Sequence, residues 1–241
     1  MHKFIIYLFL LNNLIYAKPL YTFGNISINH LNWSNSTEQK TNHKDFNYIE
    51  IEGGAGYSWG DFYGFIDIEN PSKSYDNQSN ENLRYVIKPI FDINIANNFA
   101  FHIQDYYFKS KDFYVNNLIY GISYKYVTKN FWFRPVVGLH YQDSTYYSGN
   151  NGYMIRWAFN YDFNIKSNKF SISQWHEMEF NREKEHYQFS DGKKNGTNGA
   201  LSIWWHLNKK ITTGIQYRYA DHKLGNDSYQ NAYIYSLKYN F

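Results

Sequence analysis

The feature that most constrains this chain is the strict alternation of its last twelve residues, 230–241. Large apolar side chains occupy every second position from Tyr233 to Phe241, and small or polar side chains lie between them at Ser236, Lys238 and Asn240. Successive side chains of an extended strand point to opposite faces, so the pattern predicts a strand with one apolar and one polar face. Chain ends usually fray, yet this one ends on an aromatic residue. A barrel, which must pair its last strand with its first, accounts for such an ordered end.

The connections between the predicted strands are of two kinds. From Phe46 onward, segments of about 10 residues, the length that a tilted membrane strand needs, are joined alternately by short turns and longer polar loops. The short turns are 58–60, 96–98, 128–130, 166–168 and 208–210, and the longer loops are 35–45, 71–82, 110–114, 144–150, 183–197 and 222–229. This segregation predicts an all-β fold: a closed antiparallel transmembrane β-barrel of about twelve strands, with short periplasmic turns and longer outer loops. A soluble β-sandwich, the alternative, has no reason to sort its loops by length.

The composition agrees with strands that are apolar on one side only. The chain has 26 Tyr, 19 Phe and 7 Trp, yet its mean hydropathy is -0.65. Only the outward half of each strand in a transmembrane barrel meets lipid, so such chains are polar on average and rich in interfacial aromatic residues. Pro89 lies within one alternating strand and cannot donate to the ladder, so we expect a bulge or an opened ladder there. The pattern leaves the facing of segments 23–33 and 99–108 open.

Residues 1–17 have the layout of a secretory signal peptide. They contain a cation at Lys3, an apolar run over 4–11 and a small residue at Ala17. We therefore expect a cleaved signal at 1–17 and a barrel domain at 18–241. No later segment approaches the roughly 18 consecutive apolar residues of a membrane-spanning helix. The net charge of +3 is small and its basic residues are scattered, which argues against nucleic acid as a partner.

If the apolar faces meet lipid, the opposite faces line the interior. Along 46–71, aromatic rings and carboxylates alternate on this predicted inner wall, and cations and tryptophans occupy inner positions on other strands. Flat rings can stack on a flat solute while charged groups bond its polar edge. The predicted pathway residues are Tyr48, Glu50, Glu52, Tyr63, Phe65, Asp67, Arg84, Lys88, Trp175 and Arg218. The alternative is an ion-pair network that only fills and stiffens the barrel.

Two stretches resemble known outer-membrane proteins. The last strand, ending Tyr-Asn-Phe241, resembles the carboxy-terminal signature of bacterial outer-membrane barrels. Tyr48-Ile-Glu-Ile-Glu52, followed by Trp59-Gly-Asp-Phe-Tyr-Gly-Phe-Ile-Asp67 and Pro71, resembles the amino-terminal signature of the Tsx-type nucleoside-specific channels and their OmpK relatives. The similarity is strongest over 43–71 and continues more loosely through 83–95, 105–108 and the end of the chain.

The resemblance implies a monomeric twelve-stranded barrel in the outer membrane of a Gram-negative bacterium, through which nucleosides or similar small solutes diffuse down their gradient. It implies no cofactor. The partners implied are outer-membrane lipid and lipopolysaccharide, and the barrel-assembly machinery acting on the strand that ends at Phe241. Some members also serve as phage or colicin receptors through their outer loops.

Other functions stay open on the sequence: a general small-solute porin, a structural or adhesive barrel, or an outer-membrane enzyme of the phospholipase type. An enzyme needs a nucleophile or activated water held by a histidine and a carboxylate or amide. Histidines fall at or near predicted strand ends, at His140, His176, His186, His206 and His222. The nearest to a constellation is His176-Glu177 with His186, but no serine lies beside a histidine in a recognisable motif, and His176 falls on the lipid side. No histidine pair has metal-ligand spacing on one strand face, so we predict a channel without catalytic residues or metal.

Overall fold

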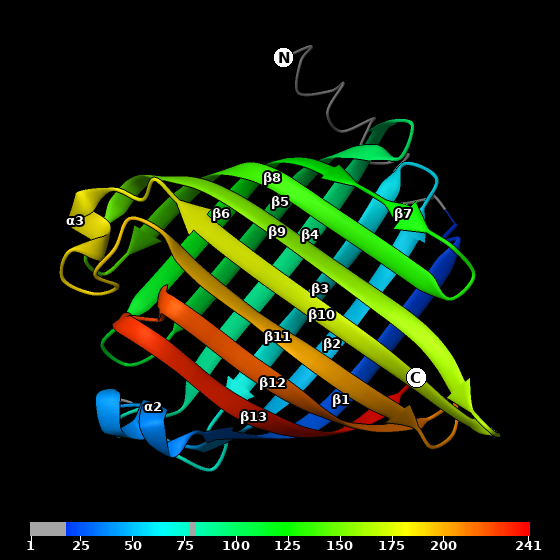
Figure 1. Ribbon diagram of the computed structural model, residues 1–241, viewed down its shortest axis with the longest axis horizontal. Helices are drawn as coiled ribbons and strands as arrows, with labels where there is room; N and C mark the ends of the chain where they lie inside the picture. Colours follow the sequence, from blue (N-terminus) through cyan, green and yellow to red (C-terminus); the bar gives the residue numbers. More distant parts are fainter. Residues whose placement is uncertain (1–17, 78–80) are drawn as a thin grey trace, which may run out of the picture.

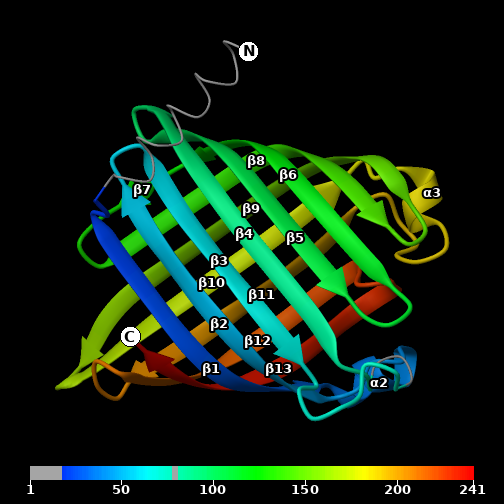
Figure 2. The ribbon, with the colours of Figure 1, turned by 180° about the vertical axis from the view of Figure 1, so that it is seen from behind.

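The computed structural model describes residues 18–77 and 81–241, and the predicted signal peptide at 1–17 lies outside the described residues. The described chain forms one antiparallel sheet that closes on itself (Figures 1 and 2). Consecutive strands pair with each other, except that β6 and β7 both pair with β8, and β1 pairs with β13. Among these residues, no helix has the length and apolar content needed to cross a bilayer.

The strands run between an end with short turns and an end with longer loops. Their bounds are β1 (Tyr21–Trp33), β2 (Phe46–Tyr57), β3 (Gly60–Glu69), β4 (Arg84–Ala96), β5 (Phe99–Lys109), β6 (Tyr114–Tyr124), β7 (Tyr126–Val127), β8 (Phe131–Ser144), β9 (Ser148–Ile165), β10 (Asn168–Phe180), β11 (Gly196–His206), β12 (Ile211–Lys223) and β13 (Asn226–Asn240). In the described part of the chain, two short helices, α2 (Asn35–Lys40) and α3 (Lys184–Tyr187), lie at the long-loop end, opposite the C-terminus (Figure 1).

Closure follows from the alternating last strand. β13 pairs with β1 from Asn25 opposite Asn240 to Trp33 opposite Ala232, and the Phe241 N–H donates to the Gly24 carbonyl at 3.0 Å. Tyr233 is 49% exposed, and Tyr235, Leu237 and Tyr239 of β13 and the following Phe241 are also exposed. Ser236 and Ala232, from the opposite face, are buried. The predicted closed barrel with an apolar outer face and a polar inner face is therefore confirmed.

Prolines open the ladder at two places. The pairs Lys88–Tyr106 and Pro89–Asp105 are missing from the β4–β5 ladder, although the register is the same on both sides of the gap. The β8 ladder to β6 and β7 has the same kind of gap opposite Arg134 and Pro135, with no change of register. Proline has no N–H to donate, so the opened ladder expected at Pro89 is confirmed. The gap at Pro135 separates β6 from β7, which are two parts of one barrel strand, and the barrel has twelve strands in this sense.

Two of the longer loops were predicted wrongly. β8 and β9 extend so far that only 145–147 connect them, and only 224–225 connect β12 and β13. The polar residues of 144–150 and 222–229 therefore largely continue the strands as protruding hairpins. Their sequences resemble loops because they lie beyond the lipid, where no apolar face is required. Positive φ at Leu224 (63°) and Gly225 (74°) permits the two-residue turn.

The structure also defines the facing that the sequence left open. In β1, Asn25, Ser27 and Asn29 are buried while Ile26 and Ile28 are exposed. In β5, Ala100, His102 and Gln104 are buried, and the residues between them point outward. Over 25–29 and 100–104 these inner faces are small or polar, and their hydrogen bonds lie inside the barrel.

Candidate functional site: the interior of the barrel

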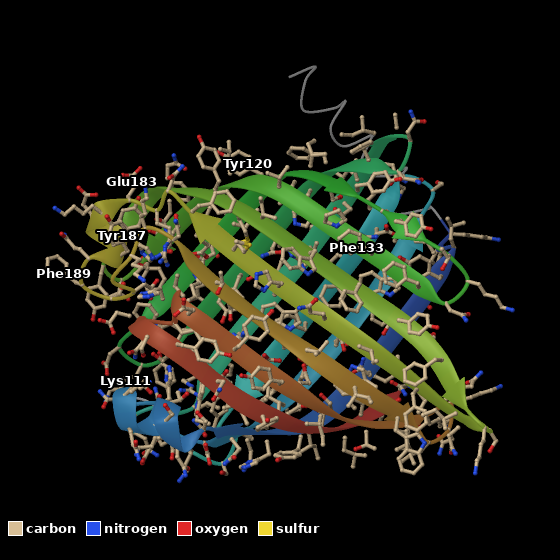
Figure 3. All side chains as sticks on the ribbon, in the orientation of Figure 1. Lys111, Tyr120, Phe133, Glu183, Tyr187 and Phe189 are labelled. Carbon is tan, nitrogen blue, oxygen red and sulfur yellow. The ribbon has the colours of Figure 1, made fainter. Side chains whose placement is uncertain are left out.

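The ten predicted pathway residues have buried or half-buried side chains on β2, β3, β4, β10 and β12, on the faces opposite the exposed apolar residues. Side chains from both walls fill the interior (Figure 3). Two of the ten lie apart from the central charges. Tyr48 belongs to an apolar cluster with Leu31, Trp33, Ala232 and Ile234, and Arg84 pairs with Glu69 at 2.7 Å. The part that each residue plays in solute passage stays a prediction.

Carboxylates gather on the β2–β3 wall because the register places them side by side. Glu50 lies directly opposite Asp67, and Glu52 lies two residues along β2. Lys238 is the cation in contact with this group, at 3.0 Å from Glu52 and 3.8 Å from Glu50. The Lys238 side chain reaches across the small Ser27 of β1. Ser27 is the register partner of Lys238 on one side and of Glu50 on the other. Two carboxylates therefore share one ammonium group, with Asp67 beside Glu50. Among the described residues, one Asp67 oxygen is buried without a hydrogen-bond partner.

Aromatic rings flank this acidic group. Tyr63 donates its hydroxyl to Glu52 at 2.8 Å. Its ring packs edge-on to Phe65 at 6.4 Å and against Phe23 at 6.3 Å between centroids. In the ladder Phe65 lies between Glu52 on β2 and Lys88 on β4. Phe65 is therefore a flat apolar surface between an acidic and a basic group.

An ion pair crosses the bore at this level. Lys88 on β4 contacts Glu177 on β10 at 2.6 Å, although no ladder joins these two strands. Gln104 donates to the same Glu177 oxygen at 3.2 Å, and Arg156 on β9 donates to Gln104 at 2.5 Å. These four side chains form what we call the cross-bore bridge. All four are buried, so the bridge joins opposite walls through side chains alone.

Trp175 and Arg218 form a second aromatic and charged surface, which we call the Trp175–Arg218 shelf. The Arg218 guanidinium carbon lies 4.6 Å from the Trp175 ring centroid, and the Lys88 ammonium lies 5.6 Å from it. Ala200 separates the two strands, as the register partner of both Trp175 and Arg218. Its methyl group is fully buried, and its small size lets the guanidinium lie over the ring.

A further network, absent from the predicted set, lies at the short-turn end. Arg134 bridges Asp61 at 2.7 Å and Asp92 at 2.5 Å. Lys125 contacts Asp61 at 2.7 Å, and His102 contacts Asp92 at 2.8 Å. The alternation in the sequence places Arg134 and Asp92 on inner faces. Lys125 lies in the ladder gap, where the alternation does not predict the direction of a side chain.

The connection 181–195 is fixed over the long-loop end. The Arg182 side chain is 0% exposed and contacts Asp191 at 2.5 Å and Glu179 at 3.4 Å. Glu179 also contacts Lys223. Burial acts to raise the pKa of Asp191, but the hydrogen bond from His186 and the charges of Lys223 and Arg182 outweigh it, so this pKa lies below its usual value. Phe189 projects from this loop with 89% of its surface exposed (Figure 3).

The comparison with protein families decides the identity. The family described as "Nucleoside-specific channel-forming protein, Tsx" matches residues 28–241. The chain belongs to this Tsx channel family. The protein is accordingly an outer-membrane channel of bacteria, and the short turns of this Tsx channel are periplasmic.

Two solved porins share the fold of the Tsx channel. The NanC porin matches it with a TM-score of 0.58 and 14% identity, over 89% of this chain and 98% of that one. The KdgM porin, solved in complex with disordered oligogalacturonate, matches with a TM-score of 0.50 and 8% identity, over 90% of this chain and 99% of that one. At these identities the similarity concerns the fold alone.

The constellation considered for catalysis, His176-Glu177 with His186, does not converge in this channel. His176 points outward, where it contacts the Tyr219 hydroxyl at 2.7 Å and packs on Trp157. Glu177 points inward to the cross-bore bridge, and His186 contacts Gln142 at 2.9 Å in the long-loop end. Within 18–77 and 81–241, no group of three or more histidine, aspartate or glutamate side chains has the geometry to hold a metal ion.

Proposed function

We propose that this Tsx-family channel passes nucleosides by passive, selective diffusion. The observation that carries the proposal is the pairing of flat rings with charged groups at one level of the bore: Phe65 beside Glu52 and Lys88, and Trp175 beside Arg218. A nucleoside has a flat base and a sugar with hydroxyl donors. The base stacks on the rings, and the sugar hydroxyls donate to carboxylates of the β2–β3 wall, such as Glu52 beside Phe65.

The strength of these contacts suits a channel. Stacking of one base on an aromatic side chain contributes about 1 to 3 kcal/mol. Passage requires binding strong enough to favour entry and weak enough to permit exit, which several weak sites in series provide. Sugars lack the flat base and amino acids lack the sugar hydroxyls, so we expect both to bind less well than nucleosides of similar size. The proposed channel performs no catalysis.

The other partners are part of the proposal. Lipid and lipopolysaccharide would contact the exposed apolar residues of the outer face, such as Ile203 and Tyr235. The barrel-assembly machinery would act on the last strand, ending at Phe241, after a signal peptide at 1–17 is removed. Phage or colicins would bind at the outer loops, where Phe189 is exposed.

Planar-bilayer recordings with purified protein test the proposal. Uridine should block the ion current at lower concentration than glucose or an amino acid of similar size. Phe65→Ala should weaken the uridine block by about 5- to 150-fold, the equivalent of 1 to 3 kcal/mol. The matched control is Phe101→Ala, which removes a lipid-facing ring and should leave the block unchanged. Equal passage of all solutes would make this a general porin, and absence of conductance would make it a structural barrel.

A further inference from the structure

The cross-bore bridge divides the interior of the barrel into two unequal parts. Lys88 belongs to β4 and Glu177 to β10, which lie on opposite walls (Figures 1 and 2). The line between them leaves β5, β6, β7, β8 and β9 on one side and β11, β12, β13, β1, β2 and β3 on the other. We call these the small sector and the large sector. Gln104 and Arg156 brace the bridge from the small sector, since both come from its strands.

The small sector is packed at and around the level of the bridge. Gln104, Ile119 and His140 form one register row across β5, β6 and β8, and each is at most 1% exposed. Val136 on β8 and Met154 on β9 face the same space and are at most 3% exposed. Side chains packed in this way leave no space for a solute between them. A solute that reaches the bridge therefore cannot pass behind it.

The large sector is open by comparison. Its inner charged side chains keep part of their surface accessible, with 19% for Glu50, 18% for Glu52 and 14% for Lys238. Other inner side chains of this sector are half-buried: Tyr63, Phe65, Gln216 and Arg218. Because these side chains face the interior, their accessible surface lies inside the barrel.

The bridge forms one boundary of this open space. Phe65 is the register partner of Lys88, so one ring lies directly beside the β4 end of the bridge. Trp175 precedes Glu177 by two residues on the same face of β10, and its ring centroid lies 5.6 Å from the Lys88 ammonium. The two ring surfaces of the proposed pathway therefore lie at the two ends of the bridge. A buried ion pair with further hydrogen bonds holds both long side chains in one geometry.

We propose that the cross-bore bridge is a partition that confines permeating solutes to the large sector and sets the size limit of the channel. This inference rests on the proposed nucleoside channel and names a determinant of its selectivity. With the partition in place, a solute passes close to both Phe65 and Trp175. Without it, the open space extends over the volume of two long side chains, so larger solutes pass and a small one can miss one of the rings.

The first test measures single-channel conductance, uridine block and liposome swelling with raffinose, an uncharged trisaccharide. The wild-type channel should exclude raffinose. Lys88→Ser with Glu177→Ser should admit it, raise the conductance, and weaken the uridine block by about 5-fold or more, the loss of one stacking contact. Lys88→Met with Glu177→Gln removes the same charges but keeps the length of both side chains, and it should still exclude raffinose. Arg156 loses its carboxylate in both double variants, so this loss cancels.

Ile119→Ala is the matched control in the small sector. It removes a fully buried side chain behind the partition, so conductance and raffinose exclusion should stay at wild-type values. If Ile119→Ala gives no folded barrel, Val136→Ala, a smaller deletion in the same sector, is measured in its place.

A second test does not alter the bridge. The chain has no cysteine, so a thiol reagent reports only an introduced one. Ser173 on β10 is half-buried, and its hydroxyl accepts a hydrogen bond from Trp204 of the large sector at 2.9 Å. Ser123 on β6, in the small sector, is 2% exposed. A charged methanethiosulfonate should modify Ser173→Cys and lower its current, and it should leave Ser123→Cys unmodified.

The partition is wrong if raffinose enters through the wild-type channel, or if the serine variant still excludes it. Equal raffinose entry in the two double variants would show that charge, and not length, sets the limit. A conductance rise in Ile119→Ala as large as in the serine variant, or equal modification of the two cysteines, would show that solutes use both sectors. If the serine variant gives no folded barrel, the cysteine pair decides. A wild type that excludes raffinose but is not blocked by uridine would reject the nucleoside channel and leave the partition standing.

Discussion

The ion pair between Lys88 and Glu177 offers a quantitative test of whether the two walls are joined through a dry interior. Both side chains are at most 10% exposed and their charged atoms are 2.6 Å apart. Removing one partner of a buried pair leaves an uncompensated charge and typically costs about 3 to 5 kcal/mol. We therefore expect Lys88→Met and Glu177→Gln each to lower the free energy of unfolding by about 3 kcal/mol or more.

The double variant separates the pair from its surroundings. Lys88→Met with Glu177→Gln removes both charges of the pair, and the introduced amide keeps an acceptor for Gln104, whose bond to Glu177 is 3.2 Å long; Arg156 loses the same carboxylate in the double variant as in Glu177→Gln, so this loss cancels in the comparison. The cost of the double variant should fall below the sum of the single costs by about 2 kcal/mol, a coupling typical of groups in one network. The measurement is urea unfolding of the barrel in lipid vesicles, followed by tryptophan fluorescence, with the m-value checked for constancy.

The chain contains a matched control pair. Lys169 and Asp162 lie 3.2 Å apart, but their side chains are 55% and 37% exposed. Water screens such a pair, and its coupling should be about 0 to 1 kcal/mol. If the Lys88–Glu177 coupling is no larger than that of Lys169–Asp162, water screens the bridge as well, and the idea of a dry connection between the walls is wrong.

Three further predictions concern the 181–195 connection, the β-bulge of β9 at Gly152, where the register with β8 shifts, and the Trp175–Arg218 shelf. Asp191 has a folded-state pKa below the unfolded value of about 3.9, so its anchoring of the 181–195 connection is present above that value and is lost as the pH falls through the folded pKa. Protection of the backbone amides in this segment, expressed relative to the intrinsic exchange rate at each pH, should be high at neutral pH and should fall in acid or in Asp191→Asn; undiminished protection in Asp191→Asn would contradict the anchoring role. Gly152→Ala should destabilise the barrel by about 1 kcal/mol or more, because φ is 77° there and a β-carbon would lie 2.2 Å from the Phe180 carbonyl oxygen; an unchanged urea midpoint would show that the strand adjusts. Ala200→Leu should displace Arg218 from Trp175 and lower the single-channel conductance, and unchanged conductance would place the pathway elsewhere in the bore.

Most of the fold could be predicted from the alternation of apolar and polar residues, because this alternation depends only on the two environments on either side of a strand. A strand between lipid and water needs alternate side chains, so β13 and the inner face of β2 could be assigned without knowledge of any partner. Pro89 could be interpreted in the same way, since the missing N–H belongs to the residue itself. The loops at 144–150 and 222–229 could not, because outside the membrane a polar hairpin and a polar loop have the same composition.

The contacts within the site were harder to predict from the sequence, because they depend on which strands face each other across the barrel. The pattern placed Lys88 on an inner face, but its partner Glu177 is 89 residues away. Lys125 lies in the gap of the ladder beside Pro135. The alternation of residues in the strand of Lys125 does not reveal this gap. The residues that face the interior could therefore be predicted from the sequence more readily than the contacts between them.

Because β1 pairs with β13, the barrel can stay dispersed in the membrane only when its last strand is in place. A chain without β13 leaves both β1 and β12 with rows of free N–H and C=O groups, and in hydrocarbon each unsatisfied group costs several kcal/mol. No smaller barrel relieves this cost without rearranging the inner charges, because Glu52 would lose Lys238 in the same step. Damage to the final strand thus exposes two unpaired strand edges and leaves the Glu52 carboxylate without its cation. A defective copy is therefore driven toward aggregation instead of forming a leaky pore.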